Sequence, residues 1–301
     1  MNYNKVLFIY NGNAGNKEIN QMLTVCLPAL AEKVDSLLVY KSLRPMHAKE
    51  LCEKYGEKVD LVIVLGGDGT VHECINGLAG LRNKPTFAIL PGGTCNDFTR
   101  SLTLSQNLQE AVEEIIQGKE ESVDVIQVND GYFLNFWGLG LIAETANNID
   151  KDEKNKFGRA SYFMSALRTI QNQDPIETVI NLDEREIKEE IVMLLVANGH
   201  YIGTKGIPFS SVKWNDGLLD LFIIRNANFR LIKEMIDLRR EDEDEAFKDE
   251  ILHLQGRELT ISTKQTVDVD MDGEVYTKTP STIKVLPEHI RMIVPSDINK
   301  E

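Results

Sequence analysis

The chain has 301 residues, of which 42% are hydrophobic and 27% are charged. This composition supplies enough apolar side chains for packed cores and excludes a largely disordered polypeptide. The length favours two domains, because single cores stop growing near about 250–300 residues. The net charge of −14 opposes binding to nucleic acid phosphates as the main activity, so we expect no nucleic acid partner.

The expected compartment follows from sequence signals that are missing. No apolar run approaches the roughly 18–20 residues of a membrane span, and residues 1–5 lead into a strand pattern rather than an export signal. The four cysteines contain no Cys-x-x-Cys pair, which argues against a zinc site and a disulfide framework. We therefore expect a cytoplasmic protein with reduced thiols.

Short apolar runs alternate with helical patterns in the first part of the chain. The runs predicted as strands cover residues 5–10, 36–40, 60–65 and 86–90. The run at 61–65 is apolar on both faces, which is typical of parallel strands covered by helices on each side. We predict a doubly wound α/β domain over residues 1–124.

Strands follow one another in the rest of the chain, which predicts a mostly β domain over residues 125–288. Asn129-Asp130-Gly131 indicates a hairpin, and two helices are expected near 158–172 and 228–240. The expected strands cover residues 123–128, 132–137, 176–182, 190–197, 218–224, 259–262, 266–271, 283–286 and 290–294. The last of them, within residues 289–301, is expected to return to the first domain.

Three glycine-bearing loops follow predicted strands of the α/β domain. The first covers residues 11–15, the second residues 66–70 and the third residues 91–98. In an open α/β sheet such loops gather at the carboxyl edge, where exposed N–H groups and helix N-termini attract phosphates. The alternative for the second loop is a tight turn with Asp68 as a helix cap. Three such loops together predict a nucleotide site, without the motif of a Walker-type NTPase.

Three motifs together resemble the soluble bacterial diacylglycerol kinases and the wider lipid kinase family, which includes sphingosine and ceramide kinases. They are Gly66-Gly67-Asp68-Gly69-Thr70 with Glu73, Gly93-Thr94-Cys95-Asn96-Asp97-Phe98 with Arg100, and Asp272-Gly273-Glu274. NAD kinases and phosphofructokinases share loops like the first motif, whereas the other two are more specific to lipid kinases. Gly12 departs from the family pattern, which usually has proline there, and this loosens the first loop.

The resemblance implies a fold and an activity. The fold is a doubly wound, NAD kinase/phosphofructokinase-like α/β domain followed by a mostly β, sandwich-like domain. The activity is an ATP- and Mg²⁺-dependent transfer of phosphate to the hydroxyl of diacylglycerol or a similar lipid alcohol, which gives phosphatidic acid or an analogue. Two alternatives stay open, namely a kinase for a soluble alcohol, as in NAD kinase, and a catalytically inactive nucleotide-binding regulator.

Candidate roles follow for individual residues. Asp68 and Asp97 are the expected Mg²⁺ ligands, since hard oxygen ligands suit that ion. Asp216 and Leu218 resemble the family's second, structural Mg²⁺ site, with an ordinary Asp-Gly turn as the alternative. Residues expected to hold the nucleotide are Asn11, Gly12, Asn13, Ala14, Gly15, Ser42, Gly66, Gly67, Asp68, Gly69, Thr70, Glu73, Gly93, Thr94, Asn96 and Asp97. For Glu73 the alternative is an acid that stabilises a helix dipole.

Glu274 is the expected proton acceptor, with Asp272 as the alternative, and Asp68 completes the catalytic set as the resemblance implies. The pattern at 267–271 alternates, so that Asp268, Asp270 and Asp272 share one strand face, for which a solvated sheet face is the simplest interpretation.

A lipid substrate requires contact with a membrane surface, which we expect to be the inner face. Residues 151–170 contain five basic and two acidic side chains together with several aromatic ones, so this segment can meet anionic lipid. Packing between domains is the alternative, and residues 225–240 form a second basic stretch with the same two interpretations. The oligomeric state is open, with a homodimer as one option.

Overall fold

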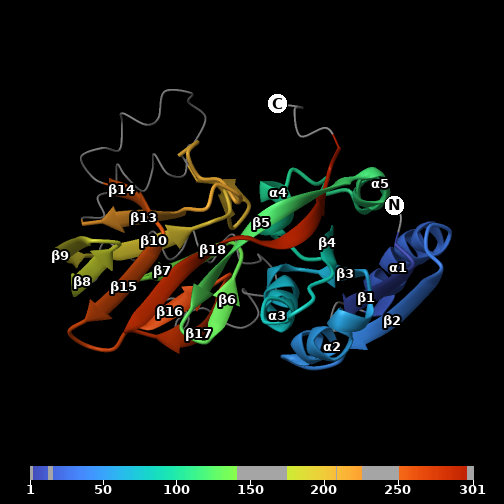
Figure 1. The fold of residues 1–301 in the computed structure, drawn as a ribbon, viewed down its shortest axis with the longest axis horizontal. Helices are drawn as coiled ribbons and strands as arrows, with labels where there is room; N and C mark the ends of the chain where they lie inside the picture. The colour runs from blue at the N-terminus through green and yellow to red at the C-terminus, as the bar shows by residue number, and fades with distance from the viewer. Residues whose placement is uncertain (1–2, 13–15, 141–174, 208, 226–250, 297–301) are drawn as a thin grey trace. The chain divides into compact units, whose positions relative to one another are not determined.

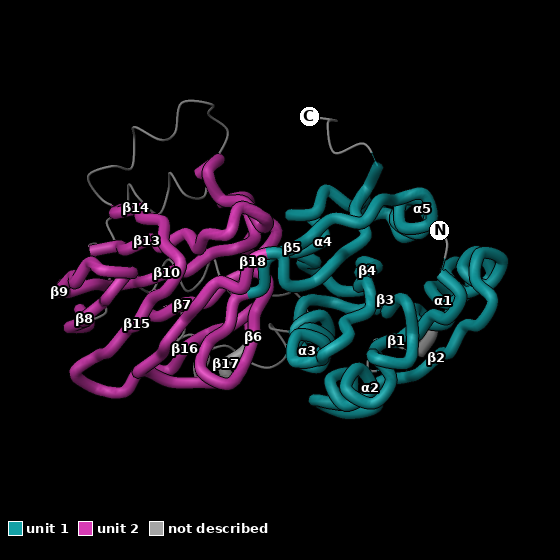
Figure 2. The backbone as a smooth tube through the Cα atoms, in the orientation of Figure 1, with its two compact units in different colours: residues 1–125, 288–301 teal, residues 126–287 magenta. Residues whose placement is uncertain are grey.

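The computed structural model describes residues 3–12, 16–140, 175–207, 209–225 and 251–296, and the rest of the chain is drawn in grey in Figure 1. The chain forms two compact units, shown in Figure 2. Unit 1 contains residues 1–125 and 288–301, and unit 2 contains residues 126–287. The helices expected at 158–172 and 228–240, and the basic segment at 151–170, lie outside the described residues.

Unit 1 is built on a parallel sheet with the strand order β2-β1-β3-β4. Its strands are β1 (Lys5–Asn11), β2 (Ser36–Ser42), β3 (Leu61–Gly66) and β4 (Thr86–Pro91), and its helices are α1 (Asn16–Ala31), α2 (His47–Tyr55), a short 3₁₀ helix (Gly56–Lys58), α3 (Asp68–Leu78), α4 (Asp97–Ser101) and α5 (Leu108–Gln117). Every residue of β3 and β4 is buried, as expected for parallel strands covered on both faces. The α/β prediction for this part is confirmed.

The described part of unit 2 contains two large antiparallel sheets with a common core and a small sheet formed by β11 and β12. One sheet has the order β14-β13-β10-β7-β16-β17. The other includes β9, β8 and β15 with the first part of β18, while β6 pairs with β5. Two strands, β5 (Lys119–Val128) and β18 (Ser281–Val294), run from one unit into the other. The strands that lie wholly in unit 2 are β6 (Gly131–Phe133), β7 (Phe136–Leu139), β8 (Ile176–Leu182), β9 (Arg185–Ile191), β10 (Met193–Ala197), β11 (Tyr201–Ile202), β12 (Lys205–Gly206), β13 (Leu219–Ile224), β14 (Ile251–Gly256), β15 (Glu258–Thr263), β16 (Asp268–Met271) and β17 (Glu274–Lys278).

The core of unit 2 is supplied by alternate residues of both sheets. Trp137, Leu194 and Leu221 come from the first sheet and meet Ile180 and Leu259 from the second. This is the arrangement of a β-sandwich, in which two inner faces interdigitate. The prediction of a mostly β, sandwich-like second domain is confirmed.

Several predicted strands differ from the observed ones. The strand expected at 132–137 is two strands, β6 and β7, with Leu134 and Asn135 between them. The strand expected at 190–197 is also divided, because β9 ends at Ile191 and β10 begins at Met193. The strands expected at 283–286 and 290–294 are one continuous strand, β18.

Within the described ranges, no helix combines the length and the apolar character that crossing a membrane requires.

Candidate functional site

The second and third glycine loops lie side by side at the carboxyl edge of the unit 1 sheet. They follow β3 and β4, which pair in parallel up to Gly66 and Pro91. The Gly92 N–H donates to the Gly66 carbonyl at 3.1 Å, so the loops stay paired beyond the strands. A Cβ added to Gly93 would lie 2.4 Å from the Gly67 Cα, so the two backbones approach each other too closely for Gly93 to carry a side chain.

The first glycine loop begins at the same edge, because β1 pairs in parallel with β3. The Asn11 side-chain amide donates to the Thr70 hydroxyl of α3 at 3.3 Å, and the Gly12 N–H donates to the Ser42 carbonyl at 3.1 Å. These two contacts connect the first loop to the second and to the end of β2. The remaining predicted residues of this loop, Asn13, Ala14 and Gly15, lie outside the described residues.

Asp68 connects the second loop to the third. Its two carboxylate oxygens accept the backbone N–H groups of Asn96 at 3.1 Å and Asp97 at 2.8 Å. These groups lie at the start of α4, so Asp68 caps α4 although it belongs to the first turn of α3. A carboxylate held by two charge-assisted hydrogen bonds has a fixed orientation.

Asn96 shapes the third loop from within. It has a left-handed backbone conformation with φ 52°, and its side-chain oxygen accepts the Gly93 N–H at 2.8 Å while its amide donates to the Gly93 carbonyl at 3.1 Å. The same amide reaches Gln106 at 3.4 Å, and the Gln106 amide donates to the Thr99 hydroxyl at 3.0 Å. The loop is therefore held by a hydrogen-bonded network, with Thr94 exposed at its tip.

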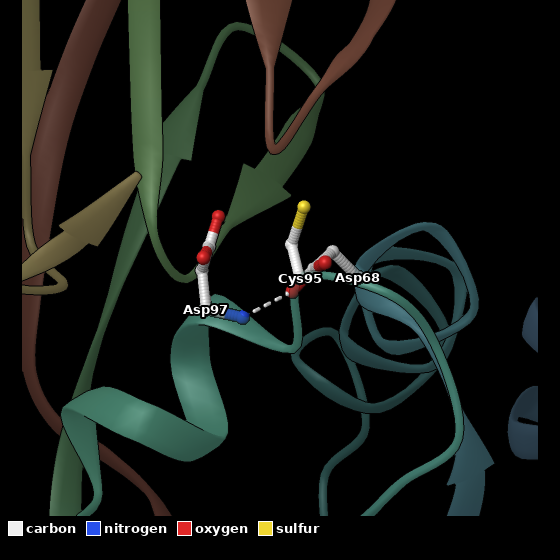
Figure 3. A group of neighbouring side chains, drawn as sticks. All are labelled: Asp68, Cys95 and Asp97. Atoms are coloured by element: carbon white, nitrogen blue, oxygen red, sulfur yellow. Dashed lines mark hydrogen bonds between the residues drawn. The ribbon is translucent and has the colours of Figure 1, made fainter. Parts of the chain in front are cut away.

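Asp68, Cys95 and Asp97 form a group of potential ligands. One carboxylate oxygen of each aspartate and the Cys95 sulfur all lie within 4.8 Å of one another. Figure 3 shows the three side chains together with the hydrogen bond from the Asp97 N–H to Asp68. Asp97 is 5% exposed, and a buried carboxylate so close to a second one favours a bound cation.

Glu73 also reaches a neighbouring helix. Its carboxylate accepts the Ala48 N–H in the first turn of α2 at 3.1 Å. The residue before that helix, Met46, has a left-handed φ of 65° and provides no side-chain cap. Glu73 therefore performs the capping and dipole-stabilising function for α2.

Asp272 is a buried anchor within unit 2. It is 6% exposed, and its carboxylate accepts the backbone N–H groups of Leu134 at 3.3 Å, Asn135 at 2.9 Å and Phe136 at 3.0 Å. Leu134 and Asn135 form the break between β6 and β7, and Phe136 begins β7, so the predicted strand is divided where Asp272 takes up its N–H groups. Asp270 is 4% exposed, so the hypothesis of a solvated face for these acids is wrong beyond Asp268.

Glu274 is the first residue of β17, directly after the turn that Asp272 and Gly273 form. Both turn residues have positive φ, 51° and 90°, and the Gly273 N–H donates to Asp270 at 2.7 Å. Asp216 occupies a separate turn, where its carboxylate accepts the Leu218 N–H at 3.0 Å. This is an Asx turn with Gly217 at φ 73°.

Sequence reasoning missed three features of this region: Cys95 as a member of the ligand group, Gln106 as a support of the third loop, and the capping of α2 by Glu73. The position of Cys95 within the Gly93 to Phe98 motif was visible in the sequence. The other two depend on contacts 10 and 25 residues apart, for which the local sequence contains no signal.

Comparisons with known proteins agree with this arrangement. Residues 5–128 match the diacylglycerol kinase catalytic domain, and residues 139–294 match the YegS C-terminal NAD kinase beta sandwich-like domain. A Staphylococcus haemolyticus protein that is provisionally named a lipid kinase is 35% identical over 297 residues, which cover 97% of this chain and 96% of that protein. A protein of Staphylococcus aureus (strain MRSA252) with a similar provisional name is 33% identical over 98% of this chain and 99% of its own.

A solved structure leads to the same conclusion. The crystal structure of a diacylglycerol kinase from Bacillus anthracis has a TM-score of 0.88 and 38% sequence identity, and the match covers 99% of both chains. With two family models matched along the chain and relatives of such identity over nearly its full length, the chain belongs to the lipid kinase family that includes the bacterial diacylglycerol kinases, and it is a phosphotransferase with an alcohol group as acceptor.

Proposed function

We propose that the enzyme transfers the terminal phosphate of ATP, with Mg²⁺, to the hydroxyl of diacylglycerol or a similar lipid alcohol, and releases phosphatidic acid or its analogue. The observation that supports this most strongly is the group of Asp68 and Asp97 beside paired glycine loops at the carboxyl edge of a parallel sheet. Phosphoryl transfer depends mainly on positioning and on neutralising phosphate charge, and this edge offers N–H groups and carboxylates for both tasks.

The nucleotide phosphates are proposed to bind along the glycine loops. The N-terminus of α3, which begins at Asp68 directly after the second loop, attracts anions there. The rigid approach of Gly67 to Gly93 supports a fixed phosphate position. Residues proposed to hold the nucleotide are Asn11, Gly12, Asn13, Ala14, Gly15, Ser42, Gly66, Gly67, Gly69, Thr70, Glu73, Gly93, Thr94 and Asn96.

Asp68 and Asp97 are proposed to hold Mg²⁺, directly or through its waters. The donor set fits this ion in part, because two carboxylates with retained waters suit it while the neighbouring thiol does not. When bound, the ion neutralises charge on the phosphates. The two N–H groups that donate to Asp68 orient the carboxylate toward this role.

Glu274 is proposed to accept the proton of the lipid hydroxyl. Asp272 is less suited to that role, because its carboxylate already accepts three backbone N–H groups in a buried position. These three hydrogen bonds fix the Asp272 carboxylate as a structural acceptor for residues 134–136. A second, structural Mg²⁺ is proposed at Asp216 and the Leu218 carbonyl, which predicts that Mg²⁺ raises the melting temperature of the wild type more than that of Asp216→Asn.

The test is a radiolabelled-ATP assay with acceptors in two forms. Mixed micelles containing diacylglycerol are compared with soluble alcohols, including NAD, at increasing Mg²⁺. We expect label to enter the lipid fraction only when both Mg²⁺ and diacylglycerol or a related lipid are present. If only a soluble alcohol is labelled, the enzyme is a kinase for a soluble alcohol and not a lipid kinase. If the protein binds nucleotide but transfers no phosphate, it is an inactive nucleotide-binding regulator.

A further inference from the structure

A thiol lies within the acidic group at the edge of unit 1, and the proposed chemistry does not use it. The Cys95 sulfur is within 4.8 Å of the ligand oxygens of Asp68 and Asp97, and Cys95 is only 2% exposed. Figure 3 shows the thiol and the Asp97 carboxylate pointing to the same side of the third glycine loop. Mg²⁺ binds oxygen ligands and keeps several waters, so a sulfur atom is not a suitable ligand for it.

Backbone hydrogen bonds hold this group from both sides of Cys95. The N–H groups of Asn96 and Asp97 donate to Asp68, and the Arg100 side chain donates through Nε to the Cys95 carbonyl at 2.9 Å. Partners of this kind orient metal ligands in known sites and raise metal affinity. The Asp68 carboxylate and the backbone of residues 95–97 are therefore held in place before an ion binds.

We propose that Asp68, Cys95 and Asp97 bind a thiophilic divalent cation such as Zn²⁺ or Cd²⁺, which displaces Mg²⁺ and inhibits the kinase. The inference rests on the proposed role of Asp68 and Asp97 as Mg²⁺ ligands. Thiolate ligands select Zn²⁺ and similar ions over Mg²⁺, and three protein ligands leave a fourth position for water or a phosphate oxygen. The thiol proton passes to solvent as the metal–sulfur bond forms.

The geometry requires only a small adjustment. Around a tetrahedral Zn²⁺, with sulfur at about 2.3 Å and oxygens at about 2.0–2.2 Å, the ligand atoms lie roughly 3.5 Å from one another. The present limit of 4.8 Å closes to that value through side-chain movement of about an ångström. The braced backbone does not have to move.

Cys74 provides a matched control thiol. It lies on α3, the helix that begins with Asp68, but it does not belong to the ligand group. A hydrogen bond with the Cys52 thiol, together with burial, raises the pKa of Cys74 well above its ordinary value. Such a thiol is a poor metal ligand, because the thiolate is the form that binds.

The test is a Cd²⁺ titration of the full-length protein, without nucleotide or lipid, followed by the ultraviolet absorption of the cadmium–thiolate bond. We expect this absorption to saturate at one ion per chain, to disappear in Cys95→Ser and to persist in Cys74→Ser. Asp97→Asn should keep the absorption but require at least tenfold more Cd²⁺. Added Zn²⁺ should remove the wild-type absorption, and melting curves show which variants are folded.

A second measurement connects the site to inhibition. At a fixed Mg²⁺ concentration, Zn²⁺ should inhibit the wild type and Cys74→Ser at concentrations at least tenfold lower than Cys95→Ser. Absorption that survives in Cys95→Ser, or that is lost in Cys74→Ser, would overturn the metal site. Cys95-dependent absorption in a protein that transfers no phosphate would retain the metal site and contradict the proposed kinase function instead.

Discussion

Asp68 combines a structural contact with a proposed metal contact, and both depend on its charge. We expect Asp68→Asn to lower the kinase rate more than tenfold, which corresponds to about 1.4 kcal/mol of barrier. We also expect a lower melting temperature, because an amide offers only one acceptor atom to the N–H groups of Asn96 and Asp97. An unmade hydrogen bond of this kind costs about 1–3 kcal/mol. Steady-state kinetics and thermal melting of the same preparation measure both effects.

Asp60 is a control for the structural part of that prediction. Its carboxylate also accepts two backbone N–H groups, from Asn4 at 3.1 Å and Lys5 at 2.8 Å, but it lies outside the glycine loops. One oxygen of Asp60 accepts both groups, so Asp60→Ala is the variant that removes the acceptor, and it should lower the melting temperature with little change in rate. Equal losses of activity in the Asp60 and Asp68 variants would show that Asp68 acts only through stability.

Substitutions of Asp272 and Glu274 are expected to affect different quantities, stability for the first and kcat for the second. We expect Glu274→Gln to reduce kcat strongly, with the KM for ATP and the melting temperature nearly unchanged, because a proton acceptor acts on the lipid hydroxyl in the transition state. Asp272→Asn should instead lower the melting temperature, since three N–H groups lose their charged acceptor in a buried site.

Kinetics and melting of both variants decide between the two assignments. If Asp272→Asn is fully folded and inactive while Glu274→Gln keeps its kcat, the roles of the two acids are the reverse of those proposed.

At the scale of elements, the contact between the second and third glycine loops depends on the absence of side chains. In Gly93→Ala the added methyl would lie 2.4 Å from the Gly67 backbone, so one loop must move away from the other. We expect a higher KM for ATP and a lower melting temperature. Gly80→Ala is the matched control, because nothing lies within 4 Å of a Cβ added there. That variant should leave kinetics and stability nearly unchanged, and an equal loss in both would contradict the importance of this contact.

The strands that sequence patterns predicted are those with apolar alternation or continuous apolar runs. β9 was missed over most of its length because it is an edge strand whose residues are mainly charged and exposed. β18 was predicted as two strands because Pro287 and Glu288 interrupt the pattern. In the structure Glu288 has a φ of 50°, and its N–H donates at 2.7 Å to the buried Asp124, which lies 164 positions away. The sequence around Glu288 contains no pattern from which this hydrogen bond to Asp124 could be predicted.

The site shows the same division between local and distant information. Glycine-bearing turns after strands are local features, so the three loops and their aspartates could be identified from the sequence. The contact of Asp68 with α4 joins residues 28 and 29 positions apart, and the anchoring of residues 134–136 by Asp272 spans up to 138 positions. These contacts depend on the register of strands and on loop paths, which a sequence pattern does not contain.

At the scale of the whole molecule, a net charge of −14 opposes binding to anionic lipid, so attraction must come from a local basic segment. We expect replacement of Lys154, Lys156 and Arg159 by Gln to weaken binding to anionic vesicles by up to about 3 kcal/mol at low salt and to reduce its salt dependence. Activity on a short-chain, monomeric acceptor should hardly change. Co-sedimentation across a salt series measures the binding.

The control removes three cations from a different part of the chain. Lys188, Lys264 and Lys278 are exposed and each pairs with an acid. Their replacement by Gln changes the net charge equally, from −14 to −14 − 3 = −17. If both triple variants bind vesicles alike at every salt concentration, residues 151–170 do not provide the membrane contact. The other basic stretch, 225–240, is then the candidate for membrane contact, although its first residue, Arg225, already pairs with Glu189.

The path of β18 affects how the protein is made. Residues 288–294 of this strand belong to unit 1, where Met292 pairs with Phe87 of β4. In the sequence, all of unit 2 lies between residue 125 and this last segment of unit 1. During synthesis one edge of β4 therefore stays unpaired until the ribosome has made the whole of unit 2 and then residues 288–294. An open strand edge is a template for pairing with other chains. A fragment that ends at residue 125 would keep that edge permanently, so the nucleotide-binding half of this kinase is not a separable module even though most of it is made first.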